Sequence, residues 1–282
     1  MEIDINITLQ DRLYYMKFNF NSYIEHQCLK ASQYLNGSFY CLVMNRLSKS
    51  SIKYRFENMN YFVEEASTRH YFIKPRGDRY RKGLKFIAEK VMKSYSIYGL
   101  PINKNDLVVD VGANNGDLIL GLPMCRYTAF EPAPIEFALL VKNKFPDAQI
   151  HNLAVGKESK KSQFYLSSQG ADSSLFEPPT VDKVIQVQQV RLDEVLNESI
   201  KLLKIDAEGG ELEVLMGAQN ILDQIDYIAV DVGFEKGKNQ ESTAPEVLNF
   251  LYSNDFELFQ HTNDLRFLFR NKTFKKFREN KI

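Results

Sequence analysis

The residues Asp106-Leu-Val-Val-Asp-Val-Gly-Ala-Asn-Asn-Gly116 carry the strongest structural signal in the chain. Residues 107–111 form a short, β-branched and largely apolar run, which predicts a buried strand. The small residues that follow permit a tight turn whose backbone can approach a ligand. Residues 117–120 predict the start of a helix, capped by Asn114 or Asn115. A strand, a tight turn and a helix in this order are typical of the first nucleotide-binding unit of a doubly wound α/β domain.

Two acids narrow the choice of nucleotide. Residues 127–131 predict a second strand that ends in Glu131, about 20 residues after the turn, where such folds hold the two hydroxyls of a ribose. A dinucleotide site needs Gly-x-Gly-x-x-Gly, but Ala113 stands in place of the middle glycine. Asp110, at the end of the first strand, would repel a diphosphate and favours a cationic ligand. The pattern therefore indicates S-adenosylmethionine, with an NAD-binding oxidoreductase as the alternative.

Three further motifs follow the turn: Phe130-Glu-Pro132, Asn152-Leu-Ala-Val-Gly156 and Leu203-Lys-Ile-Asp-Ala-Glu-Gly209. Together with the turn, and over roughly residues 70–270, they resemble the FkbM family of S-adenosylmethionine-dependent methyltransferases. The resemblance implies a Rossmann-like class I methyltransferase fold, which is an α/β architecture with a seven-stranded, mostly parallel sheet and a reversed C-terminal strand. It also implies O-methylation of a hydroxyl group on a sugar, a glycan precursor or a natural product.

The predicted cofactor site combines the turn, the acid after the second strand and segments that the resemblance assigns. The resemblance places residues 151–154 beside the adenine and Ser173 and Ser174 beside the cofactor or substrate, although a serine-rich surface turn explains the two serines equally well. His151 could be a base, but a lone histidine in a strand is more often a packed side chain. The predicted cofactor-binding residues are Asp110, Gly112, Asn114, Gly116, Glu131, Asn152, Ala154, Ser173 and Ser174.

Three acids are predicted to catalyse the reaction at the carboxyl edge of the sheet. A strand predicted at residues 200–206 ends in Asp206, and Glu208 comes two residues later. Asp231 lies near the end of a strand predicted at residues 226–232. Clustered carboxylates raise at least one pKa, which suits a general base, so Glu208 or Asp206 is the candidate. An acid at this point can instead cap or order the start of the following helix.

A divalent metal is the alternative to a metal-free base. Related O-methyltransferases of the catechol and macrocin types place acids at the ends of these two strands around a magnesium ion. Asp206 and Asp231 resemble that layout, and oxygen ligands suit Mg²⁺. We favour the metal-free mechanism, because the sequence shows no third ligand.

The remaining pattern divides the chain into three parts. Residues 1–68 form an N-terminal accessory segment without a motif, residues 69–272 the methyltransferase domain, and residues 273–282 a basic tail. Within the domain we expect a helix at 82–98, an inserted hairpin around 162–190, and a closing antiparallel pair between 256 and 270.

Basic residues accumulate between Arg69 and Lys93. The simplest interpretation is a solvated helix face. The sharper hypothesis is that Arg76, Arg79 or Arg81 holds an anionic part of the acceptor, such as a phosphate. The acceptor itself is expected to be a small molecule or a glycan.

Composition restricts the partners of the protein. The 282 residues include 36 Lys plus Arg and 36 Asp plus Glu, so no net positive field attracts nucleic acid or an anionic membrane. The start of the sequence is acidic and lacks an apolar h-region, and no apolar run is long enough to cross a bilayer. The three cysteines are expected to be free thiols in a reducing compartment. We therefore expect a cytoplasmic protein. The composition is compatible with a monomer or a homo-oligomer.

Overall fold

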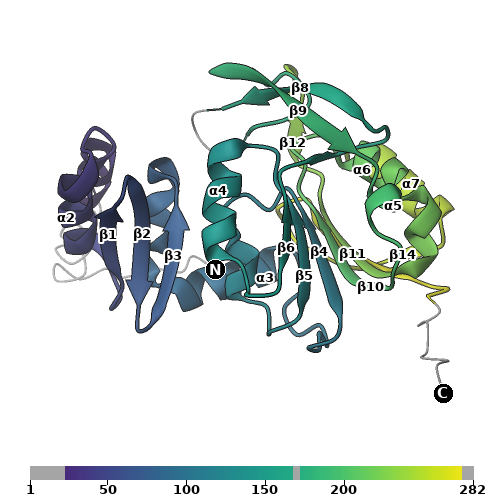
Figure 1. Cartoon of the computed structure of the whole chain (residues 1–282), viewed down its shortest axis with the longest axis horizontal. Coiled ribbons are helices and arrows are strands. Elements are labelled where there is room, and N and C mark those ends of the chain that lie inside the picture. The colour runs from purple at the N-terminus through teal and green to yellow at the C-terminus, as the bar shows by residue number, and fades with distance from the viewer. Residues whose placement is uncertain (1–22, 168–171, 275–282) are drawn as a thin grey trace, which may run out of the picture.

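A seven-stranded sheet forms the centre of the computed structural model, which describes residues 23–167 and 172–274 (Figure 1). The strand order is β14-β15-β11-β10-β4-β5-β6, and neighbours pair in parallel except β15, which runs antiparallel to both β11 and β14. This arrangement confirms the predicted class I methyltransferase fold. The strands are β4 Leu107–Val111, β5 Arg126–Phe130, β6 Gln149–His151, β10 Ile200–Ile205, β11 Ile225–Asp231, β14 Phe256–His261 and β15 Arg266–Asn271.

Helices cover both faces of this sheet, which explains why its central strands are apolar throughout. Along β4, Val109 and Val111 pack into the core under α5, α6 and α7, whereas Val108 faces the core under α3 and α4. Successive side chains of a strand point to opposite faces, so one apolar run serves two cores. The helices are α3 Leu84–Ser94, α4 Pro134–Asn143, α5 Leu192–Val195, α6 Glu211–Gly217, η3 Gln219–Gln224 and α7 Ala244–Ser253.

The helix after the glycine turn is shorter than predicted. It is a single 3₁₀ turn, η2 Asp117–Leu120, and its N-cap is Gly116 in the left-handed region, with no side-chain cap. The predicted cap by Asn114 or Asn115 is therefore wrong. The Asn115 side chain instead donates hydrogen bonds to the Tyr80 hydroxyl, to the carbonyl of Tyr71 and to the Asp117 side chain, and none to the backbone of η2.

The inserted hairpin is confirmed as a separate layer above the main sheet (Figure 1). Strands β8 Lys160–Leu166 and β9 Lys183–Val190 pair antiparallel, and the short β7 Ala154–Val155 adds to β9 in parallel. Part of the loop between them, residues 168–171, lies outside the described residues. A smaller pair, β12 Phe234–Lys236 and β13 Glu241–Ser242, follows β11.

The N-terminal unit is an antiparallel sheet of three strands beside α2 Gly37–Leu47. It has its own aromatic core, including Tyr40, Tyr54 and Phe72. The sheet crosses the expected boundary at residue 68, since its last strand starts there. Its strands are β1 Lys53–Glu57, β2 Asn60–Glu65 and β3 Thr68–Phe72, and η1 Lys74–Lys82 connects it to α3.

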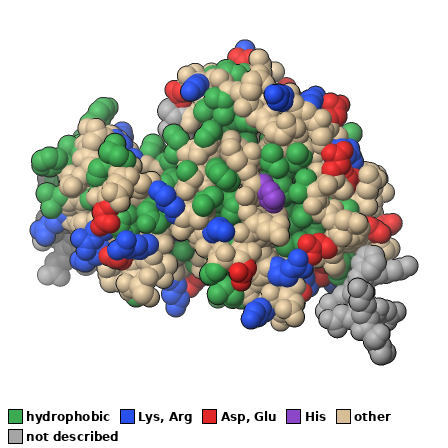
Figure 2. All heavy atoms as spheres, in the orientation of Figure 1, with side chains coloured by type: hydrophobic (Ala, Val, Ile, Leu, Met, Phe, Trp, Pro, Cys, Tyr) green, Lys and Arg blue, Asp and Glu red, His purple; other side chains and the backbone are tan. Residues whose placement is uncertain are grey.

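The surface shown in Figure 2 agrees with the even charge balance of the sequence. Residues 1–22 of the accessory segment and 275–282 of the basic tail lie outside the described residues. Figure 2 shows basic and acidic side chains mixed across one face of the molecule. Within the described residues, no helix has the length and apolar character that a membrane span requires.

Candidate active site

A cavity of about 300 Å³ opens where the carboxyl ends of β4, β5 and β10 meet. This is the edge at which the strand order reverses, between β4 and β10, and open α/β sheets bind ligands at such a point. The cavity brings together most of the predicted cofactor residues. Those that line it are Asp110, Gly112, Asn114, Glu131, Ala154 and Ser173, together with Asp206 and Glu208.

The glycine turn is shaped by its neighbours in the protein. Gly112 has a φ of +71°, and a Cβ atom there would lie 1.7 Å from the carbonyl oxygen of Asp206. The adjacent backbone therefore requires glycine at this position, whatever ligand the cavity holds. Gly116 does not line the cavity, and a Cβ there would meet Leu140 at 2.7 Å, so packing inside the protein accounts for this glycine, and its contact with the cofactor stays a prediction.

Glu131 is fixed beside the turn by two backbone N–H groups. Asn114 donates to one carboxylate oxygen and Ala133 to the other, each at 2.8 Å. Burial raises the pKa of Glu131 to about 8, and the repulsion from Glu136 adds to this effect. A buried carboxylate of this kind gains from further hydrogen-bond donors.

Asn152 supports this segment and does not line the cavity. Its amide donates to the carbonyl oxygens of Glu131 and Pro132 and so holds this loop, whereas its contact with the cofactor stays a prediction. The following residues, Leu153 and Ala154, form the cavity wall instead. His151 stacks on Phe130 with ring centroids 4.9 Å apart and lies outside the wall, as expected for a packed side chain.

Lys204 is a buried cation that we did not predict, although it lies within the Leu203–Gly209 motif. Its Nζ is 3.0 Å from Asp110 and 3.4 Å from Asp206, and it donates to the carbonyl of Gly112 at 2.9 Å. Asp110 therefore already has two partners in the protein, Lys204 and the Tyr127 hydroxyl. Its charge does not by itself require a cationic ligand. A lysine in the middle of an apolar strand was the available signal, because such a charge needs a partner.

Four carboxylates lie close together beside Lys204, and we call Asp206, Glu208, Asp231 and Glu235 the acid cluster. Oxygen atoms of Asp206, Asp231 and Glu235 lie within 4.8 Å of one another. Glu235, from β12, is the third acid that the sequence did not reveal, because its position depends on the fold of a loop after β11. Asp231 was predicted to be catalytic, but it accepts from Arg266 and from the Gly233 N–H and does not line the cavity.

The pKa values of the acid cluster shift in different directions. Burial alone would raise the pKa of Asp206, but Lys204 and the hydrogen bond from Tyr95 lower it below its ordinary value. Burial and the charges of Asp206 and Glu235 raise the pKa of Glu208. Burial and Asp231 raise the pKa of Glu235 to about 9.

Glu208 combines an unusual backbone with a carboxylate that faces the cavity. Its φ is +50°, and its carbonyl oxygen accepts a 2.7 Å hydrogen bond from the Ser174 hydroxyl. Among the described residues, none donates a hydrogen bond to the Glu208 carboxylate. Ser174 is buried and holds this loop, whereas Ser173 lines the cavity, so the structure separates two residues that were predicted to act together.

A set of hydrogen-bonded polar side chains joins the N-terminal sheet to η2. We call these residues, His70, Arg79, Tyr80, Asn115 and Asp117, the junction network. The Asp117 carboxylate contacts His70 at 2.8 Å and Arg79 at 2.9 Å, and it accepts from Tyr80 at 2.6 Å. Asn115 donates to the Tyr80 hydroxyl at 2.9 Å.

The three arginines of the predicted anion site separate at this point. Arg76 and Arg79 line the cavity. Arg81 donates to the Leu47 carbonyl and pairs with Glu25, so its proposed contact with an acceptor is wrong.

Comparison with known proteins identifies one family. Residues 110–258, more than half of the chain, match the model of the methyltransferase FkbM domain. Methyltransferase 1 of Beauveria bassiana is 29% identical over 189 residues, which cover 55% of this chain and 75% of that protein. The 31-O-demethyl-FK506 methyltransferase FkbM of Streptomyces tacrolimicus is 28% identical over 169 residues, which cover 45% of this chain and 65% of that protein. A crystal structure of methyltransferase FkbM from Methylobacillus flagellatus KT aligns at 16% identity with a TM-score of 0.42, over 71% of this chain and 55% of that one.

Proposed function

Because the chain belongs to the FkbM methyltransferase family, we propose that it transfers a methyl group from S-adenosylmethionine to a hydroxyl group of a small molecule or glycan. The observation that carries this proposal is the cavity, whose lining includes Glu131 and two members of the acid cluster, Asp206 and Glu208. Methyl transfer needs little more than in-line positioning and a base for the hydroxyl proton. The cavity offers residues for both tasks.

The residues around the glycine turn fit the cofactor. Glu131 is a buried carboxylate that accepts two backbone hydrogen bonds, and burial still raises its pKa to about 8, so further donors would stabilise its charged form. The two hydroxyls of a ribose would supply such donors. Leu153 and Ala154 would border the adenine, and the segment from Gly112 to Asn114 would border the amino-acid end. When bound, the cofactor supplies an electrophilic methyl group on a sulfonium.

Glu208 is the proposed general base. Its carboxylate faces the cavity and is not held by other side chains of the described structure, unlike that of Asp206, which accepts from Tyr95. The raised pKa of Glu208, caused first by burial, makes it a stronger base than an exposed carboxylate. Asp206, kept ionised by Lys204, would orient the hydroxyl or the cofactor ammonium group.

The acceptor class rests on a relative. The Streptomyces tacrolimicus protein is named as a methyltransferase of 31-O-demethyl-FK506, which is an O-methylation of a natural product. A sugar, a glycan precursor or another natural product therefore remains the proposed acceptor class. The N-terminal unit lies outside the matched residues and contributes to the cavity through η1, so acceptor preference is expected to depend on it.

The direct test is calorimetric titration of the purified protein with S-adenosylmethionine, S-adenosylhomocysteine and NAD. We expect both sulfur ligands to bind with micromolar affinity and NAD to give no heat. Binding of NAD without binding of S-adenosylhomocysteine would overturn the proposal in favour of an oxidoreductase. The Glu131→Ala variant serves as the matched control, because it should weaken both sulfur ligands.

A magnesium-dependent mechanism is the second candidate, and Glu235 favours it. With Glu235, the acid cluster has three oxygen ligands close together, which is enough to begin a magnesium site. Arg266, however, already pairs with Asp231, and Lys204 with Asp206, so two of the three acids have a cation. EDTA should leave the rate unchanged if Glu208 acts alone. Complete loss of turnover that Mg²⁺ or Mn²⁺ restores would establish the metal-dependent mechanism.

A further inference from the structure

One wall of the cavity is cationic and comes from outside the residues that match the family model. Arg76 and Arg79 of η1 and Lys90 of α3 form this cationic wall. All three precede residue 110, where the family match begins. We propose that the cationic wall binds an oxyanion, a phosphate or carboxylate group, carried by the methyl acceptor. This inference rests on the proposed function, because it describes a ligand of the same cavity.

Arg79 is held in place for such a contact. One of its terminal nitrogens lies 2.9 Å from Asp117, whose carboxylate His70 and Tyr80 also fix. A guanidinium carries five N–H donors in a rigid fork. Asp117 occupies one end of that fork, and a quarter of the side chain, 24%, is exposed at the cavity. The remaining donors can therefore meet an oxyanion without a costly rearrangement of the arginine.

Lys90 adds a second, uncommitted charge. It is exposed, lines the cavity, and makes no ion pair or hydrogen bond to any other residue that the structure describes. Lys204 and Arg266, the other cations of the cavity, are both paired with acids. Lys90 thus differs from them, because its charge is available to a ligand.

The charge distribution limits where an anion can lie. Asp206, which lines another part of the cavity and stays ionised, would repel an anion, and the buried Glu131, Glu136 and Glu208 offer it no positive charge. Asp264 lies near Lys90, but it is one acid beside three cations, and Asp117 is occupied by the junction network. Because Lys204 and Arg266 are already paired with acids, the cationic wall is the part of the lining best suited to an oxyanion.

Two ligands could supply the oxyanion. The carboxylate of the cofactor's methionyl group has the same chemistry as an acidic acceptor. The acceptor is favoured, because the cationic wall lies outside the family-matched residues that carry Glu131 and the glycine turn. Acceptors vary between relatives more than the shared cofactor does, so their contacts are expected in the variable part.

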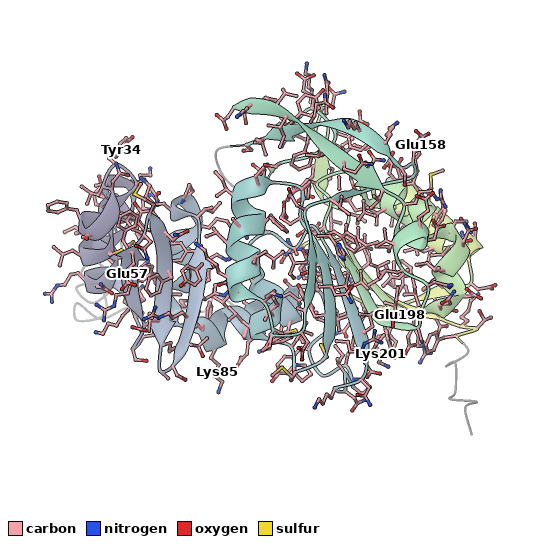
Figure 3. All side chains as sticks on the ribbon, in the orientation of Figure 1. Tyr34, Glu57, Lys85, Glu158, Glu198 and Lys201 are labelled. Atoms are coloured by element: carbon pink, nitrogen blue, oxygen red, sulfur yellow. The ribbon has the colours of Figure 1, made fainter. Side chains whose placement is uncertain are left out.

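The test measures binding of inorganic pyrophosphate to the full chain, free and saturated with S-adenosylhomocysteine. For the acceptor site we expect pyrophosphate to bind in both states, and Arg79→Gln and Lys90→Gln to weaken it by about tenfold and threefold. Binding of S-adenosylhomocysteine and of 5′-methylthioadenosine, which lacks the amino-acid group, should not change in Lys90→Gln. Lys85→Gln is the matched control, since Lys85 is on the same helix, does not line the cavity and extends away from the molecule in Figure 3.

Each other outcome overturns the acceptor assignment. If S-adenosylhomocysteine excludes pyrophosphate, and Arg79→Gln weakens S-adenosylhomocysteine but not 5′-methylthioadenosine, the oxyanion is the cofactor's own carboxylate. If the wild type does not bind pyrophosphate, or Lys85→Gln weakens it as much as Lys90→Gln, the cationic wall is not an anion site. Failure of S-adenosylhomocysteine to bind refutes the proposed cofactor instead, and the pyrophosphate titration of the free protein still tests this wall.

Discussion

The junction network and the acid cluster are both buried groups of carboxylates and cations, yet their acids have opposite properties. Arg79 and His70 outweigh the effect of burial on Asp117 and hold its pKa well below the ordinary value. In the acid cluster, burial and mutual repulsion raise the pKa values of Glu208 and Glu235. A buried carboxylate with several cations and hydrogen-bond donors stabilises the fold. A buried carboxylate with few donors has a higher proton affinity, which a general base needs. We therefore expect the junction to control stability and the cluster to control turnover.

The largest effect should come from removing the proposed base. Glu208→Gln keeps the shape of the side chain but cannot accept a proton, so kcat should fall by about 10²–10⁴-fold. The affinity for S-adenosylhomocysteine and the melting temperature should stay near the wild-type values. Radiolabelled methyl transfer to the acceptor measures the rate, and Glu158→Gln, an exposed acid labelled in Figure 3, is the control. An unchanged kcat would place the chemistry elsewhere in the cluster.

Removing the central acid of the junction should have the opposite profile. Asp117→Ala leaves Arg79 and His70 without their partner, and breaking a buried pair in this way costs about 3–5 kcal/mol of unfolding free energy. Urea denaturation measures the loss. If Asp117→Ala unfolds at the wild-type urea concentration, the junction contributes no net stability and the contrast between the two regions fails.

A smaller effect is expected at Glu131, which lines the same cavity but belongs to neither region. Glu131→Ala removes the acceptor proposed for the ribose hydroxyls, so S-adenosylhomocysteine should bind about 10- to 100-fold more weakly. The unfolding midpoint shows whether the variant keeps its fold. Unchanged affinity in a folded variant would remove Glu131 from the site.

The smallest predicted effect is on the pH dependence of stability, where the two regions have opposite signs. Glu131 and Glu235 have folded pKa values of about 8 and 9, above those of the unfolded chain, so their contribution is present below about pH 4.5 and is lost as the pH rises toward 9. Asp117 has a lowered pKa, so its contribution is present above about pH 4 and is lost on acidification. Glu235→Gln should raise the melting temperature at pH 9 by about 2–4 °C relative to its effect at pH 5. Equal changes at both pH values would contradict this assignment.

The sequence predicts the main sheet well because its signals are local. Apolar runs at residues 107–111 and 200–205 and the spacing from the glycine turn to Glu131 depend on nearby residues, and the structure confirms the strands. The resemblance added the reversed strand. Periodicity and turn chemistry are therefore sufficient for the central strands of the main sheet, but not for the N-terminal sheet or for the short helix after the glycine turn.

The site residues that the sequence missed depend on contacts between distant segments. His70 meets Asp117 across 47 positions, and Tyr95 meets Asp206 across 111. Glu235 lies in a short strand after β11 that no local pattern indicates. Gly116 and Asn152 show the reverse case. They belong to the motifs that predicted the site, but in the structure they hold loops and do not line the cavity.

The position of β15 has a consequence for how the protein is made. During synthesis β11 and β14 leave the ribosome before β15, yet in the finished sheet β15 lies between them and pairs with both. Until β15 emerges, these two strands keep unpaired edges, which are prone to aggregation. Its first residue, Arg266, also neutralises Asp231 and completes the cavity wall. A nascent chain released before Arg266 would therefore be inactive and prone to aggregation. A chaperone would be most useful between the synthesis of β14 and that of β15.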